Sequence, residues 1–244
     1  MGTRAWTAAA LAAVTLIGAC GDKQVAPTPA PPEERAVAYA SAREDLERAR
    51  VALGERWAAA AADPVARAAV LREARVTVWR GVTDELIPRW LGTPWTFNGH
   101  TVTPGEGSIA CGYFVTTVVR HAGFDVDRVA LAQAASEKII LTLADPAETW
   151  RFSDRASEEV VAEVRAAGGD GLYAVGLDRH AALLVIDGDR ADLCHSSVLN
   201  ERDVTCEDAA EAGGFVSRYR VIGKLLGARM LVPWLEGRHI DSVL

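Results

Sequence analysis

Apolar residues recur at helical spacing in the first part of the chain and at strand-like spacing only near its end. Between about residues 35 and 90 the chain is rich in Ala, Arg and Glu, with Leu46, Leu53 and Trp57 on one face of a predicted helix. Asp63-Pro64 then supplies an N-cap and a first-turn proline for a second helix. One face of that helix carries Leu71, Val78, Val82 and Leu86. Residues 35–90 are therefore predicted to form a helical hairpin that supports the rest of the chain.

After Pro88 the pattern changes to a loop rich in Gly and Thr, followed by an apolar run that begins at Cys111 and predicts a helix. Two more helices are predicted, one with Ala132, Ala135, Ile139 and Leu143 on one face and one with Val160, Val161 and Val164. Short β-type runs come only afterwards, at 172–177, 182–186, 191–194 and 219–225. Helices followed by an antiparallel sheet predict an α+β domain over residues 91–244.

The N-terminus has the pattern of an export signal, with Arg4 before a short apolar run of small residues. The run ends in Leu16-Ile17-Gly18-Ala19-Cys20, which resembles the lipobox of bacterial lipoproteins. That resemblance implies a signal peptide at 1–19, a diacylglycerol on Cys20, and a location in the cell envelope. The Gly that follows Cys20 favours the periplasmic face of the outer membrane in a Gram-negative host. Residues 20–34 contain four prolines and predict an extended tether.

Charge and cysteine content narrow the possible partners. The chain has 26 Lys and Arg against 33 Asp and Glu, a net charge of -7, and no basic stretch that could follow a nucleic acid backbone. Nucleic acid is therefore not an expected partner, whereas the membrane is one through the lipid on Cys20.

Of the four cysteines, three remain after Cys20, so an exported chain should leave one of them unpaired.

Three residues suggest thiol chemistry. Cys111 stands at a predicted helix start, where free N–H groups and the helix dipole stabilise a thiolate. A buried structural cysteine would show the same local pattern, so the pattern around Cys111 alone does not distinguish a nucleophile from a structural residue. His180 opens a predicted strand and His195 ends the next one, so antiparallel pairing would bring the imidazoles together as a base and its orienting partner. His100, His121 and His239 are expected to be ordinary surface residues.

Several segments resemble the NlpC-type cell-wall cysteine peptidases in their order along the chain. They are Gly92-Thr93-Pro94-Trp95-Thr96-Phe97-Asn98-Gly99, Cys111-Gly112-Tyr113-Phe114-Val115, Arg120-His121-Ala122-Gly123-Phe124, the strand-like 171–177, His180 to Ile186, and Leu193-Cys194-His195-Ser196-Ser197. The resemblance covers about residues 90–200. It implies a papain-like fold with Cys111 as nucleophile, His180 as general base and acid, and His195 as its orienting residue. It also implies peptidoglycan stem peptides as the substrate.

Three positions that would line the substrate site depart from the family pattern. Ala110 and Gly112 replace the Asp and Ser that help to bind the amine of the stem peptide, and Trp95 replaces a Tyr. Residues 125–169 also form a longer connection than usual, which could be a lid or rim. These departures leave open an acyltransferase or amidase acting on another envelope substrate. A catalytically silent lipoprotein that binds a partner in the same cleft also remains open.

If Cys111 is the working thiol, Cys194 and Cys206 remain to form a disulfide in an oxidising compartment. A zinc site from Cys194, His195, His180 and Cys111 is the alternative, but the chain has no close ligand pair such as C-x-x-C. No metal and no cofactor are therefore expected.

Overall fold

The computed structural model describes residues 31–199 and 202–243 and has a mixed α+β architecture, as predicted. Its centre is a six-stranded antiparallel sheet with the order β1-β6-β2-β3-β4-β5. The strands are β1 (Thr149–Ser153), β2 (Gly171–Leu177), β3 (Ala181–Asp187), β4 (Arg190–Ser196), β5 (Val204–Asp208) and β6 (Tyr219–Lys224). The main helices are α1 (Pro32–Ala59), α2 (Pro64–Arg80), α3 (Ile87–Trp90), α4 (Cys111–His121), α5 (Arg128–Gln133), α6 (Ser136–Leu143), α7 (Ser157–Gly168) and α8 (Ala228–Glu236).

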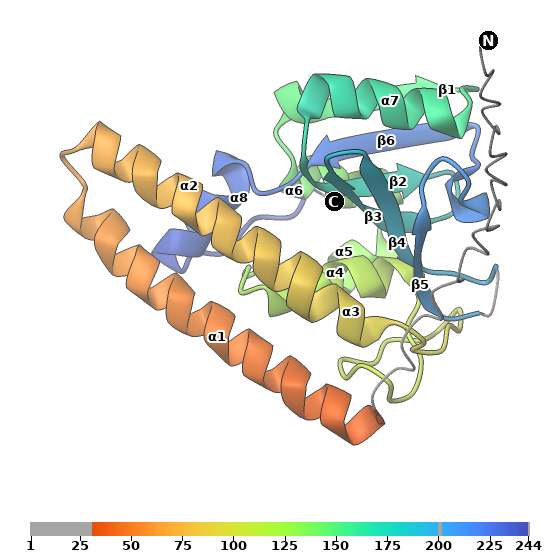
Figure 1. Cartoon of the computed structure of the whole chain (residues 1–244), viewed down its shortest axis with the longest axis horizontal. Helices are drawn as coiled ribbons and strands as arrows, with labels where there is room; N and C mark the ends of the chain where they lie inside the picture. The colour runs from red at the N-terminus through yellow and green to blue at the C-terminus, as the bar shows by residue number, and fades with distance from the viewer. Residues whose placement is uncertain (1–30, 200–201, 244) are drawn as a thin grey trace, which may run out of the picture.

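The two long N-terminal helices pack against each other and against α8 (Figure 1). Asp63 caps α2 as predicted, because its carboxylate accepts hydrogen bonds from the N–H groups of Val65 and Ala66. Helix α1 begins at Pro32, inside the segment predicted as tether, since proline fits the first helical position and Glu33 and Glu34 suit the positive end of the dipole. No helix in the described ranges is both long and apolar enough to cross a bilayer.

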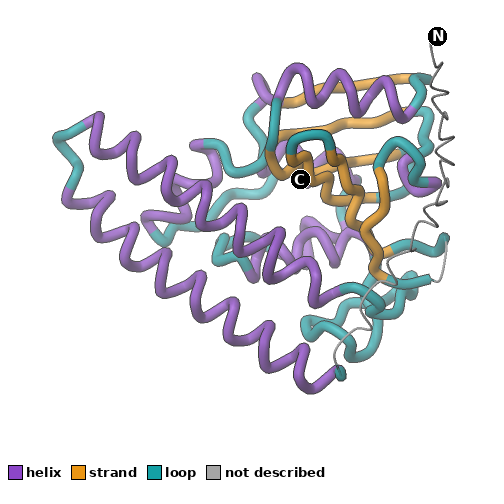
Figure 2. Tube along the Cα trace, viewed as in Figure 1, coloured by secondary structure: helices purple, strands orange, loops and turns teal. Residues whose placement is uncertain are grey.

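Helices cover both faces of the sheet (Figures 1 and 2). Alternation along β2 divides its side chains, so Leu172 and Ala174 pack in the cluster that contains α4, whereas Tyr173 and Val175 pack in the cluster that contains α7. The sheet is thus buried on both sides, and helix α4 lies between it and the N-terminal helices.

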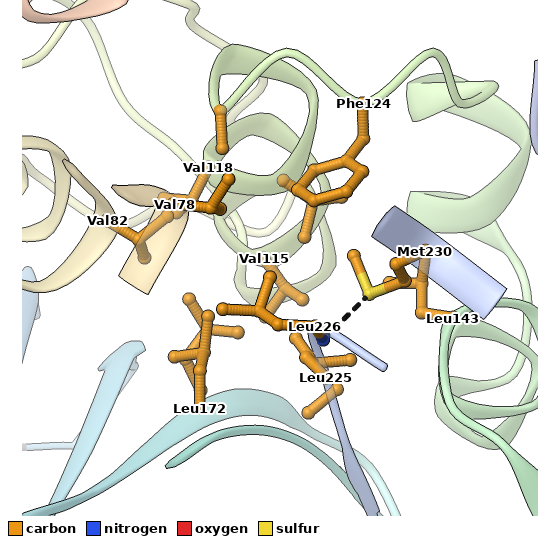
Figure 3. Packing of buried hydrophobic residues seen from close by; sticks show 14 of the residues in the cluster. Val78, Val82, Val115, Val118, Phe124, Leu143, Leu172, Leu225, Leu226 and Met230 are labelled. Atoms are coloured by element: carbon orange, nitrogen blue, oxygen red, sulfur yellow. Dashed lines mark hydrogen bonds between the residues drawn. The ribbon is translucent and has the colours of Figure 1, made fainter. Parts of the chain in front are cut away.

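The larger core lies where α2, α4, α8 and the sheet meet (Figure 3). Val78 of α2, Val115 and Val118 of α4, Leu172 of β2 and Met230 of α8 are all at most 3% exposed. Burial of such side chains contributes roughly 1.5–3 kcal/mol each. This packing holds α4 against the sheet.

One predicted helix is wrong, and two strands were missed. The predicted helix over Ala132 to Leu143 is broken, because Ala134 and Ala135 are extended between α5 and α6. The hydroxyl of Ser136 donates to the carbonyl of Leu177 at 2.9 Å, which holds the new helix start against β2. Strands β1 and β5 were not predicted. Both are short edge strands, and the polar residues they expose interrupt the apolar pattern.

His121 is a further correction, since it is buried rather than on the surface. The indole N–H of Trp90 donates to the hydroxyl of Tyr39 at 2.9 Å, and that hydroxyl lies 2.9 Å from Nδ1 of His121. Burial, with three nearby arginines, lowers the pKa of His121 to about 3, so its imidazole is neutral and can accept this bond. The network joins α1 and α3 to the end of α4.

We predict that Tyr39→Phe lowers the free energy of unfolding by about 1–3 kcal/mol, because it leaves the Trp90 N–H and the His121 nitrogen buried without their partner. Tyr219→Phe is the matched control, since its hydroxyl lies in a half-buried position and bonds exposed or half-buried charged side chains, with Glu137 at 3.3 Å. Urea unfolding at pH 7 measures both. Equal stability of Tyr39→Phe and wild type would contradict the structural role of this network.

Candidate functional site

A cavity of about 1030 Å³ opens between the start of α4, the turn from β2 to β3 and the loops that surround them. Its walls contain five of the six residues predicted for catalysis and substrate binding: Trp95, Ala110, Cys111, Gly112 and His180. The sixth, His195, is fully buried next to His180. The tertiary structure therefore brings all six together from segments far apart in the sequence.

Cys111 is half-buried, unpaired and the first residue of α4. The residue before it, Ala110, makes no side-chain cap, so no side chain of that residue competes for the N–H groups of the first turn. The approach to the helix is held in place by backbone bonds from Ile109 to Pro94 (2.9 Å) and from Ala110 to Gly99 (2.8 Å). The Ser196 hydroxyl at the end of β4 also donates to the Ile109 carbonyl at 2.7 Å. The start of α4 is thus anchored to the sheet.

Two histidines and a glutamate form a chain of hydrogen bonds that begins at the cavity wall. Nε2 of His180 lies 2.7 Å from Nδ1 of His195, and Nε2 of His195 lies 2.9 Å from Oε1 of Glu207. The pairing of the two histidines agrees with the sequence prediction. Glu207 was not predicted, because its strand β5 was missed and nothing in the local sequence distinguishes it from a surface acid.

The local environment keeps both imidazoles neutral. Burial, and secondly the neighbouring His195, lower the pKa of His180 to about 3. Burial also lowers the pKa of His195, although the Glu207 carboxylate opposes this shift. Near pH 7 His180 is therefore an uncharged imidazole, which is the form that can accept a proton from a thiol.

The predicted disulfide between Cys194 and Cys206 is present and joins directly paired residues of β4 and β5. It closes a 12-residue separation between the strand that carries His195 and the strand that carries Glu207. Because side chains alternate along a strand, the disulfide lies on the opposite face of the sheet from these two residues. With Cys194 oxidised, it cannot serve as a metal ligand. Across the described ranges, no three His, Cys, Asp or Glu side chains are grouped to hold a metal ion.

The segment that carries Trp95 is attached to the beginning of β5. The Gly92 N–H donates to the Val204 carbonyl at 2.8 Å, and the Trp95 N–H donates to the Arg202 carbonyl at 2.7 Å. These bonds place the Trp95 side chain at the cavity wall. Figure 2 shows this loop region at the end of the sheet, next to α3.

Gly112 lies in a sterically closed position. A Cβ on Gly112 would lie 2.5 Å from the carbonyl oxygen of Ala132, which is a backbone atom at the end of α5. No larger residue fits without moving that backbone. The connection over residues 125–169 therefore contributes Ala132 and Gln133 to the cavity wall, which agrees with the expectation of a rim.

Gly214 packs directly against His195. A Cβ at this position would lie 2.3 Å from Cε1 of His195. The loop is held there by Arg220, which is almost fully buried and donates from Nε to the Phe215 carbonyl at 2.8 Å. Sequence reasoning did not identify Gly214, although the Gly213-Gly214 pair near the end of the sheet is the signal that could have done so.

The remaining histidines stand outside this chain of bonds. His100 lies on the cavity wall, exposed, and its ring bonds the Asn98 carbonyl at 2.9 Å. His239 is exposed and lies 3.3 Å from an Asp125 oxygen. Both fit the expectation of ordinary surface residues.

We predict that Gly214→Ala lowers the free energy of unfolding by about 1–3 kcal/mol, because the added methyl group must displace His195 or the loop. It should also shift the imidazole ¹⁵N resonances of His195. Gly213→Ala is the control, since its Cβ would meet only a side-chain atom of Leu199 at 3.8 Å. Urea unfolding and ¹⁵N NMR measure the two effects. Indistinguishable behaviour of the two variants would contradict the proposed contact.

Comparison with known proteins returns no match for this chain, either among protein-family models or among curated proteins. The resemblance to the NlpC-type peptidases therefore rests on the sequence segments alone.

Proposed function

We propose that this chain is an exported thiol hydrolase that cleaves amide bonds through Cys111, His180 and His195. The observation that carries the proposal is the shared cavity of Cys111 and His180, together with the 2.7 Å hydrogen bond from His180 to the buried His195. A nucleophile, a base on a separate element and a third group that orients the base are the parts that covalent acyl transfer requires.

In the proposed reaction, the neutral His180 takes the proton of the Cys111 thiol and the sulfur attacks the substrate carbonyl. N–H groups in the first turn of α4, including that of Cys111, stabilise the negative charge on the carbonyl oxygen. The imidazolium then gives its proton to the leaving amine, and an acyl-enzyme remains on the sulfur. Water, deprotonated by His180, hydrolyses the thioester and restores the thiol.

In this proposal the domain over residues 91–244 has a papain-like arrangement, with a nucleophile-bearing helix packed on an antiparallel sheet. The packing of α4 on β3 and β4 supports that arrangement. The helices over residues 35–90 act as a support, because Tyr39, which also accepts a bond from Trp90, is bonded to His121 at the end of the nucleophile helix. This role needs no binding activity of their own.

Peptidoglycan stem peptides are the first substrate to test, on the basis of the resemblance to the cell-wall peptidases. The lipobox around Cys20 supports a location on the envelope, although Cys20 lies outside the described residues. A lipid on Cys20 and the tether that follows it would place the cavity near its substrate.

A second candidate is an acyltransferase or amidase that acts on another envelope substrate, and the walls of the cavity favour it. Among the described residues that line those walls, the one carboxylate is Asp178 in the β2–β3 turn, and its Oδ2 accepts bonds from the Ser217 hydroxyl and the Arg218 N–H. The amine-binding side chains of the family are missing at Ala110 and Gly112. Exposed apolar side chains also line the opening: Phe97, Val198, Leu199 and Val216. Such an opening suits a substrate with an apolar group.

We predict a distinct order of importance among the three residues. Cys111→Ser and His180→Ala should each reduce turnover by at least about 10³-fold, because they remove the acyl carrier and the proton carrier. His195→Asn or His195→Gln should retain measurable activity, whereas His195→Ala should fall further. His239→Ala is the control, since it removes an exposed imidazole that lies outside the cavity wall.

The measurement is mass spectrometry of products from peptidoglycan and muropeptides, with a parallel panel of acyl esters and acyl amides. Circular dichroism confirms that each variant folds. Cleavage of acyl substrates but not muropeptides would favour the second candidate. Retention of more than a tenth of the activity in Cys111→Ser would contradict thiol catalysis, and no turnover on any substrate would favour a silent binding protein.

We predict that Cys20→Ala releases the protein from the membrane fraction, because lipid attachment needs the cysteine of the lipobox. Radiolabelled palmitate should enter the wild type and not the variant. Cys111→Ala is the matched control, since it removes a different cysteine and should leave labelling unchanged. Equal labelling of wild type and Cys20→Ala would show that the lipobox assignment is wrong.

A further inference from the structure

We propose that Glu207 is a positioning residue that sets the tautomers of both His195 and His180. This inference rests on the proposed function, because it assigns the nitrogen of His180 that receives the thiol proton. The geometry that carries it is the pair of contacts from His180 Nε2 to His195 Nδ1 (2.7 Å) and from His195 Nε2 to Glu207 Oε1 (2.9 Å).

The direction of each bond follows from the carboxylate at the end of the chain. An ionised carboxylate only accepts hydrogen bonds, so Nε2 of His195 must carry the hydrogen. A neutral imidazole has one N–H, which leaves Nδ1 of His195 as an acceptor. Nε2 of His180 must then donate to it. The unprotonated nitrogen of His180 is therefore Nδ1, and this nitrogen is the one left to accept the proton of Cys111.

Burial of His195 favours one of its two tautomers. The His195 side chain is fully buried, and the loop at Gly214 lies so close to its ring that a Cβ there would be 2.3 Å from Cε1. A buried imidazole that lost its acceptor would expose an unsatisfied N–H, which costs about 1–3 kcal/mol. The Glu207 carboxylate thus satisfies His195 and selects one of its two tautomers at the same time.

The register of β4 and β5 places Glu207 where it can do this. His195 pairs with Thr205 and Leu193 pairs with Glu207, so His195 and Glu207 are diagonal neighbours on one face. A long side chain can bridge such a diagonal. Between them, on the other face, the Cys194–Cys206 disulfide joins the two strands. A shift of one residue in this register would turn Glu207 away from His195.

The same chain stabilises the charge that forms in the reaction. When Nδ1 of His180 takes the proton from the sulfur, the ring becomes an imidazolium and keeps its hydrogen on Nε2. That hydrogen stays bonded to His195, whose own N–H stays bonded to the carboxylate. No proton moves along the chain, and the proton on Nδ1 leaves with the amine of the substrate. The negative charge of Glu207 favours the imidazolium through the polarised ring of His195.

The direct test is ¹⁵N NMR of histidine-labelled full-length protein in a Cys111→Ala background, where no thiol can exchange a proton with His180. We expect protonated Nε2 and unprotonated Nδ1 on both His180 and His195. Glu207→Ala should mix or reverse the tautomers of His195 and change those of His180. Glu207→Gln should give an intermediate result, because its amide oxygen can still accept the bond but carries no charge.

With Cys111 present, Glu207→Ala should reduce kcat about 10- to 100-fold while KM changes by less than about 2-fold, as for other residues that orient a reacting group. Glu207→Gln should lose less. Glu211→Gln is the matched control, since it removes the same charge from an exposed side chain four residues away and should leave both readouts unchanged.

A protonated Nδ1 on His180 in the otherwise native chain would overturn the proposal, as would tautomers that stay the same in Glu207→Ala. Neither result depends on turnover. If Glu207→Ala folds poorly, the tautomers of the chain with native Glu207 and of the Glu207→Gln variant still test the proposal. If Cys111→Ser kept full activity while the tautomers behaved as expected, thiol catalysis would be wrong and the positioning role of Glu207 would stand.

Discussion

The antiparallel register of β3, β4 and β5 is the constraint on which the candidate site depends. It brings His180, from the turn before β3, to His195 at the end of β4, and it sets Glu207 of β5 diagonally across from His195. Side chains alternate between the two faces of a sheet, so the same register puts Cys194 and Cys206 opposite each other on the other side. One disulfide and one polar chain therefore stabilise the same pairing from opposite faces.

The second requirement is that α4 presents Cys111 to this sheet at a fixed position, and the helix is held at both ends. At its start, the Ile109 carbonyl accepts a bond from Ser196 of β4. At its end, His121 is bound through Tyr39 to the N-terminal helices. Between these points its apolar face is buried in the main core (Figure 3). In the proposed function, a helix anchored in this way would need little reorganisation when a substrate binds, which is what a preorganised nucleophile requires.

The proposed reaction and the choice of its substrate depend on different groups of the cavity. The proposed reacting groups are of a kind that many acyl-transfer enzymes share, so they do not identify the acyl donor. In the proposed function, the groups that would select the substrate are Ala110, the closed space beside Gly112, and the apolar side chains at the opening. These are the positions at which the chain departs from the cell-wall peptidases.

The sequence by itself determined the elements with a strong local signal: the α2 start at Asp63-Pro64, the helix that begins at Cys111, and the apolar strands β2, β3, β4 and β6. It also predicted the Cys194–Cys206 disulfide, which is present, and selected Cys111, His180 and His195 as candidates, because cysteine and histidine are few in this chain and their order is informative. It could not identify Glu207, which is one of 33 acidic residues and lies in an edge strand with little apolar signal. Only the tertiary structure decided that Glu207 meets His195, that Gly214 packs on the same ring, and that Ala132 fills the space beside Gly112. Each of these contacts joins residues that are distant in the sequence or lie across strands, and a local sequence pattern does not predict such contacts.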